Sequence, residues 1–130
     1  MSQTSRKFKP TESELEILSI LWNKGPSTVR EVNEEMSRSK NVGYTTTLKL
    51  MQIMAEKGLV EREMDGRQHI YRAATLQEEA QVSMLDRLLQ TAFGGSASKL
   101  VLQALGNHQT SEEELQEIKD LIKKLEEEKP

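Results

Sequence analysis

One stretch decides the fold of this chain: Tyr44-Thr45-Thr46-Thr47-Leu48-Lys49-Leu50-Met51-Gln52-Ile53-Met54-Ala55-Glu56-Lys57-Gly58. Its apolar residues include a set at the spacing of a single helical stripe, Leu48, Met51, Met54 and Ala55. Gly58 supplies a residue that can adopt the left-handed conformation at a helix end. The residues off the stripe are short or amide-bearing polar residues and a lysine: Thr45, Thr46, Lys49 and Gln52. Such a helix is either an ordinary amphipathic surface helix or one built to enter a DNA major groove.

A shorter helical pattern lies just before this stretch. It runs from Val29 to about Met36, begins at a cap formed by Ser27 or Thr28, and is followed by a polar turn over residues 37–43. A short helix, a turn and a second helix make a helix-turn-helix arrangement. Because this turn is longer than in the tightest form of the motif, the pattern alone is weakly specific.

Another helix is predicted near the start of the chain. Thr11 and Glu14 have the spacing of a capping box directly after Pro10, and the run from Asn23 to Pro26 ends the pattern. The apolar residues between them face the core, namely Leu15, Ile17, Leu18, Ile20, Leu21 and Trp22. The first half of the chain therefore predicts three helices in succession.

The segment after these helices predicts a β-hairpin. Residues 59–64 and 68–73 are two strand-like runs joined through Asp65-Gly66-Arg67, a sequence typical of tight turns. Three helices followed by a hairpin is the order of a winged helix, in which the hairpin is the wing. Arg67 at the wing tip is either an ordinary solvated arginine or a residue that reaches a phosphate or a minor groove. The preceding helix-turn-helix favours the second role.

The chain from residue 76 onward predicts three further helices. The first covers residues 76–93. The second is short and nearly all apolar, begins at Ser96 or Ser98, and stops at Gly106-Asn107. The third opens with a second capping box, Ser111 and Glu114, and carries apolar residues in a 3-4-3 seam.

These three short helices expose more apolar surface than they can bury among themselves. The neighbouring winged domain could cover this surface. A homodimer, however, buries the surface of both subunits and places two winged-helix domains, here called heads, on one DNA duplex. We therefore expect dimerisation through this tail. The residues expected at the interface are Leu100, Leu102, Leu105, Leu115, Ile118, Ile122 and Leu125.

Charge divides the chain in the same way as the helix pattern. The 130 residues carry a net charge of -3. Residues 1–74 hold 12 Lys and Arg against 10 Asp and Glu, a net of +2, whereas residues 75–130 hold 6 against 11, a net of -5. A mildly basic front half can present a basic face to phosphate while the acidic half stays away from it. We predict a winged-helix domain over residues 1–75 and a helical dimerisation domain over residues 76–130.

The composition argues against several classes of protein. With no cysteine, the chain has no disulfide framework, thiolate metal cluster or cysteine nucleophile. No apolar run is long enough to span a membrane or to direct secretion, so we expect a cytoplasmic protein without a membrane partner. His69 and His108 stand in no catalytic or metal-binding spacing, and Gly94-Gly95 follows a predicted helix rather than a strand. We therefore expect no enzyme activity and no bound metal or cofactor.

Five groups of residues carry a family resemblance: Thr11-Glu12-Ser13-Glu14-Leu15-Glu16-Ile17-Leu18 with Leu21-Trp22, Val29-Arg30-Glu31-Val32, Tyr44-Thr45-Thr46-Thr47, Lys57-Gly58-Leu59-Val60, and Leu100-Val101-Leu102. Together they resemble the penicillinase-repressor family of bacterial transcription regulators, which has the copper-responsive repressors as relatives. The resemblance runs over nearly the whole chain. It implies a winged-helix head, a helical dimerisation tail and repression by occupying a promoter.

The chain departs from this family pattern in two places. The copper-responsive branch carries a C-terminal cysteine cluster, which is absent here. The beta-lactam-responsive branch is cut by a membrane-bound sensor protease at an Asn-Phe bond just after the Leu-Val-Leu stretch, and here that place reads Gln103-Ala104. Induction by cysteine-based copper sensing or by cleavage at that same bond is therefore not expected.

These patterns predict a mostly α-helical protein with a small β-hairpin wing, a winged helix-turn-helix followed by a helical dimerisation domain. We expect a transcriptional repressor that binds an inverted-repeat operator as a homodimer and is released by a signal acting on the tail. A protease that cleaves the C-terminal domain is a candidate partner. The alternative is a winged-helix module that binds another protein instead of DNA.

The residues expected to contact DNA fall into two groups. The candidates for groove contacts are Thr45, Thr46, Lys49 and Gln52, of which Lys49 and Gln52 have the reach for base edges. The candidates for phosphate contacts are Arg30, Lys40 and Arg67. The sequence does not specify the operator, the regulated genes or the inducing signal.

Overall fold

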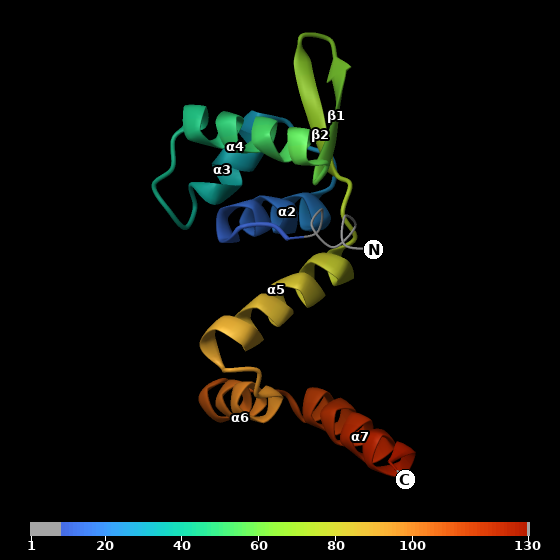
Figure 1. Ribbon diagram of the computed structural model, residues 1–130. Coiled ribbons are helices and arrows are strands. Elements are labelled where there is room, and N and C mark those ends of the chain that lie inside the picture. Colours follow the sequence, from blue (N-terminus) through green and yellow to red (C-terminus); the bar gives the residue numbers. More distant parts are fainter. Residues whose placement is uncertain (1–8, 130) are drawn as a thin grey trace. The chain divides into compact units, whose positions relative to one another are not determined.

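The computed structural model describes residues 9–129 and shows, within them, six helices and one two-stranded sheet (Figure 1). The elements are α2 (Glu12–Lys24), α3 (Val29–Met36), α4 (Tyr44–Lys57), β1 (Val60–Asp65), β2 (Gln68–Ala73), α5 (Gln77–Ala92), α6 (Ala97–Asn107) and α7 (Glu112–Glu128). The chain divides into two compact units, one ending at Arg87 and the other beginning at Leu88. No helix of the described range is long and apolar enough to cross a membrane.

The first unit has one hydrophobic core, to which α2, α3, α4 and the hairpin all contribute (Figure 1). Its buried members are Ile17, Leu18, Leu21, Val29, Val32, Met36, Met51, Met54, Leu59, Val60 and Tyr71. The predicted stripe of α4 is confirmed, because Met51 and Met54 are buried while Leu48 and Ala55 are half-buried against the core. Each large apolar side chain that is fully buried contributes about 1.5–3 kcal/mol. This core therefore fixes which face of α4 remains outside.

Local hydrogen bonds define the helix starts. Both predicted capping boxes are present, and Thr28 with Glu31 forms a third one at the start of α3. Ser27 is buried instead, and it exchanges two backbone hydrogen bonds of 2.9 and 2.8 Å with Tyr71 of β2. The loop between α2 and α3 is thereby attached to the hairpin.

The hairpin begins one residue later than predicted. Leu59 is not its first residue, because the Leu59 N–H donates to the Met54 carbonyl at 2.9 Å and completes the end of α4 around the left-handed Gly58. The two strands pair from Val60 opposite Ala73 to Asp65 opposite Gln68. Gly66 and Arg67 form the turn, and Gly66 has the positive φ of 67° that this short connection requires.

The second unit contains the end of α5 together with α6 and α7. Neither α6 nor α7 has a buried residue. The cap of α6 is Ser96. The predicted stop at Gly106-Asn107 is confirmed, because α6 ends at Asn107 and His108 is its C-cap. The Asn107 side chain donates to the Gln103 carbonyl at 2.9 Å, a contact within the last turn of α6.

The first half of α5 belongs to the unit of the winged helix. Ala80 is buried there, and the Trp22 indole N–H donates to the Thr75 carbonyl at 3.0 Å. The Arg87 guanidinium donates to the Pro10 carbonyl at 2.8 Å. The compact unit thus continues past residue 75, and the division into domains 1–75 and 76–130 stays a prediction about independent function.

Candidate nucleic-acid interface

The outer face of α4 is polar and open. Thr45, Thr46, Lys49 and Gln52 are all exposed, as predicted from their place off the apolar stripe. Thr45, Lys49 and Gln52 follow one another at helical spacings of four and three residues, so they share one face. Within residues 9–129 the Lys49 ammonium forms no ion pair. This face can present hydroxyl, ammonium and amide groups to the base edges and phosphates of a groove.

A hydrogen-bond network from α3 holds the start of α4. The Asn33 side-chain amide donates to the Val42 carbonyl at 3.0 Å and to the Thr47 hydroxyl at 2.9 Å. The Thr47 hydroxyl in turn donates to the Gly43 carbonyl at 3.2 Å, and the Thr47 side chain is buried. Neither the role of Asn33 nor that of Thr47 was predicted from the sequence. The available signal was spacing, because Thr47 precedes the buried Met51 and Met54 by four and seven residues.

An ion pair between a buried glutamate and an exposed lysine holds the other end of α4. Glu14 of α2 is only 2% exposed, accepts a 2.9 Å hydrogen bond from the Thr11 backbone N–H, and accepts another of 2.7 Å from the Lys57 ammonium. Burial by itself raises the pKa of Glu14, but the contacts with Lys57 and Thr11 outweigh it and hold this pKa below the usual 4.5. The capping residue of one helix therefore also anchors the last turn of another.

Glu14→Gln is expected to lower the free energy of unfolding at pH 7 by about 1.5–3 kcal/mol, the usual contribution of a hydrogen bond to a charged group. Because the folded-state pKa is depressed, the carboxylate contributes stability that is fully present above pH 4.5 and is lost as the pH falls through the folded-state pKa. Urea unfolding at a fixed protein concentration should show the gap between parent and variant at pH 7 closing at an acidic pH below 4.5.

The matched control for this measurement is Glu12→Gln, in the same first turn of α2 but exposed. It should change the free energy of unfolding little at either pH. A gap between the parent and Glu14→Gln that stays the same at both pH values would show that the ionised carboxylate does not stabilise the head.

The three candidates for phosphate contacts lie on separate elements. Arg30 is exposed in the first turn of α3, and Arg67 is exposed in the turn of the hairpin. Lys40, in the turn before α4, already forms an ion pair of 2.9 Å with Glu16 of α2. Such an exposed pair is worth at most about 1 kcal/mol, so it leaves Lys40 able to exchange partners. All three remain predicted contacts.

The predicted interface residues of the tail are exposed or half-buried. Leu102, Leu115, Ile122 and Leu125 are exposed, and Leu100, Leu105 and Ile118 are half-buried. Leu102 is the most exposed of them, at 71%. This unit therefore carries an apolar surface that its own helices leave open to solvent.

The described part of the chain offers no constellation typical of an enzyme. Within residues 9–129 there is no group of three or more His, Asp or Glu side chains that could hold a metal ion. The His108 ring lies 3.1 Å from the Ala104 carbonyl, where it takes part in the end of α6.

Comparisons with known proteins agree with this geometry. The sequence profile of the penicillinase repressor family matches residues 10–124. The chain is 34% identical over 82 residues to the transcriptional regulator BlaI of Mycobacterium tuberculosis. The aligned stretch covers 62% of this chain and 59% of that protein. It is 19% identical over 120 residues to the methicillin resistance regulatory protein MecI of Staphylococcus aureus. This alignment covers 92% of this chain and 98% of the relative.

Solved structures also resemble the fold. A homodimeric winged helix-turn-helix DNA-binding domain from Mycobacterium bovis matches with a TM-score of 0.51 at 20% identity, over 85% of this chain and 89% of that one. At this identity the likeness concerns the fold alone. The winged-helix architecture predicted from the sequence is thereby confirmed.

Proposed function

We propose that the chain occupies an inverted-repeat operator as a homodimer, because it belongs to the penicillinase repressor family of DNA-binding transcriptional repressors. The family match over residues 10–124 confirms the resemblance seen in the sequence, and this family is one of regulators rather than enzymes. The observation that carries the proposal is the exposed polar face of α4, on a helix fixed at both ends by Asn33 and Glu14.

In this proposal α4 enters the major groove. An α-helix fits that groove, which is about 12 Å wide, and its exposed Lys49 and Gln52 are long enough to reach base edges. Thr45 and Thr46, near the start of the helix, are short and suited to contacts with the groove wall or a nearby phosphate. Arg30, Lys40 and Arg67 supply phosphate contacts that set the register of the head on the duplex.

Dimerisation through the tail is supported by its open apolar surface. A second copy of the chain would cover the exposed leucines of α6 and α7, and a twofold interface would present two heads to two half-sites. The structural relative from Mycobacterium bovis is described as homodimeric. Because the subunits meet through the tail, a signal that disrupts the tail releases the operator.

The proposed release route is proteolysis of the tail. Gln103 and Ala104 stand where the family's beta-lactam-responsive branch has its Asn-Phe bond, and both are exposed on α6. Because neither residue matches that bond, the partner would be a protease that cuts elsewhere in the C-terminal domain. A repressor that works in this way acts where the chromosome is, in the cytoplasm.

The experiment that separates this function from a protein-binding module is a mobility-shift assay with duplex DNA from upstream of the chain's own gene, followed by footprinting. A repressor should protect two half-sites related by a twofold axis. A winged-helix module that binds only protein would protect none, because it needs no basic, polar face on α4 and the wing.

A further inference from the structure

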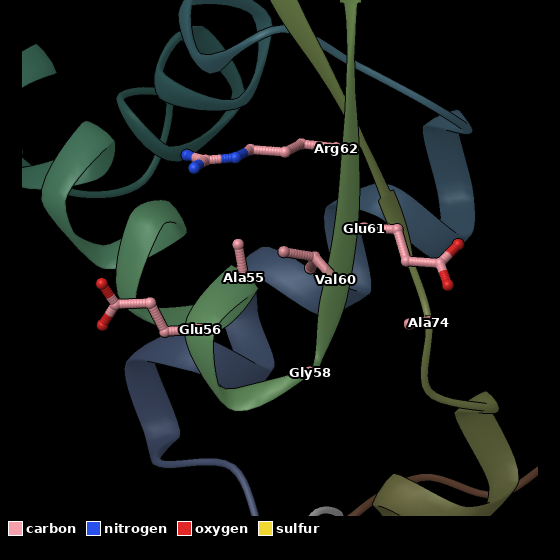
Figure 2. A pocket seen from close by; sticks show the side chains of 7 residues that line it. All are labelled: Ala55, Glu56, Gly58, Val60, Glu61, Arg62 and Ala74. Carbon is pink, nitrogen blue, oxygen red and sulfur yellow. The ribbon is translucent and has the colours of Figure 1, made fainter.

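An open hollow of about 510 Å³ lies between the end of α4 and the start of β1 (Figure 2). Ala55 and Val60 point into it, and the long side chain of Arg62 extends across it from β1 (Figure 2). Glu61 leaves the same strand in the opposite direction (Figure 2). Within residues 9–129 the Arg62 guanidinium forms no ion pair, although Glu56 also lines the hollow. An unpaired cation therefore occupies the angle between α4 and the hairpin.

The strand register separates the charges of the hairpin onto two faces. Arg62 lies opposite Tyr71, and Glu61 lies opposite Arg72. Because successive side chains of a strand point to opposite faces, Arg62 shares the face of the buried Val60 and Tyr71, toward the core and α4.

On the other face of the hairpin, the arginine already has acidic partners. There the Arg72 guanidinium pairs with the carboxylates of Glu61 at 3.3 Å and Glu63 at 3.5 Å. Arg72 already has two acidic neighbours to neutralise its charge. The face with an uncompensated guanidinium is the one beside α4, which is the side that a duplex lying on α4 would meet.

We propose that Arg62 binds a backbone phosphate of the operator, on the strand that passes between α4 and the wing tip. The inference rests on the proposed function, in which α4 lies in the major groove and Arg67 at the wing tip contacts a phosphate beside that groove. Two neighbouring grooves are separated by a sugar–phosphate backbone, which then runs over the angle that Arg62 occupies. The planar, always charged guanidinium matches a phosphate with two parallel hydrogen bonds.

The test is the salt dependence of binding to operator and to random duplex for the parent, Arg62→Gln and Arg72→Gln. Both variants lose one positive charge from the hairpin, so Arg72→Gln controls for long-range electrostatics. Loss of one phosphate contact should reduce the slope of log affinity against log salt by about 0.9 for each bound head, or about 1.8 for a dimer. The reduction should be equal on both DNAs, and Arg72→Gln should leave the slope unchanged.

Arg62→Lys completes the set, because lysine retains a point charge but lacks the planar fork. It should restore the slope. A parental slope in Arg62→Gln, with duplex binding otherwise intact, would overturn the proposal and leave the proposed function standing. A loss confined to the operator that lysine does not rescue would make Arg62 a base contact and also overturn it. A parent chain that binds no duplex would overturn the proposed function and this inference together.

Folding does not confound this test. Arg62 is exposed and forms no ion pair in the described range, so Arg62→Gln should unfold at the same urea concentration as the parent. A variant whose affinity for DNA depends less steeply on salt concentration, and which unfolds at the same urea concentration as the parent, has lost a contact with DNA.

Discussion

Leu102→Asp is expected to turn the homodimer into a monomer and to weaken operator binding by roughly 10²–10⁴. Leu102 is 71% exposed in the single chain, so the substitution removes little from the fold of one subunit. In a dimer the same position would bury an unpaired carboxylate, which costs several kcal/mol where the site cannot relax. The affinity falls because one head alone loses the gain from tethering two heads to neighbouring half-sites.

The matched control is Gln116→Asp, which adds the same charge at an exposed position of α7. At about 100° per residue, Gln116 lies at least about 100° around the helix from every predicted interface residue of α7, so it should leave the dimer intact. Sedimentation would report the oligomeric state, and a titration with operator would report the affinity. A Leu102→Asp chain that stays dimeric, or that becomes monomeric and binds as tightly as the parent, contradicts the proposed role of the tail.

Lys49→Ala is expected to weaken binding to the operator by about 1–3 kcal/mol for each half-site, or roughly 5- to 150-fold, and to affect random DNA much less. Lys49 is exposed on the outer face of α4 and has no ion pair within residues 9–129, so its loss leaves the core and the helix ends unchanged. The loss is expected to be larger on the operator than on random DNA, because a base edge of the operator loses the hydrogen-bond donor that Lys49 supplies.

The comparison for Lys49→Ala is Arg67→Ala at the tip of the hairpin. A phosphate contact should be lost equally on both DNAs, with a shallower salt dependence. Titrations of operator and random duplex at several salt concentrations would distinguish the two behaviours. Equal losses on both DNAs for Lys49→Ala would place its ammonium on the backbone instead of a base.

The parts of this fold that depend on local pattern were predictable. The capping boxes of Thr11 and Ser111 and the stripe of α4 each rest on residues a few positions apart, and all are present. The stop predicted at Gly106-Asn107 is likewise where α6 ends, with Asn107 as its last residue and its side chain bonded back to Gln103.

The contacts that position α4 were not predictable in the same way. Asn33 meets Thr47 across 14 residues, and Glu14 meets Lys57 across 43. Each of these residues has an adequate local explanation, as a surface polar residue or a capping carboxylate, so nothing in the pattern required a distant partner. The Arg62 guanidinium, which forms no ion pair in the described part of the chain, likewise depends on strand register, because the register sends Glu61 to the other face.

The central claim is that two heads joined by the tail read one operator, and a change in half-site spacing tests it most directly. Inserting about five base pairs between the half-sites turns one of them by half a helical turn, to the opposite side of the duplex. The account predicts that affinity then falls by roughly 10²–10⁴, toward that of a single half-site. An affinity that is indifferent to the insertion would contradict it.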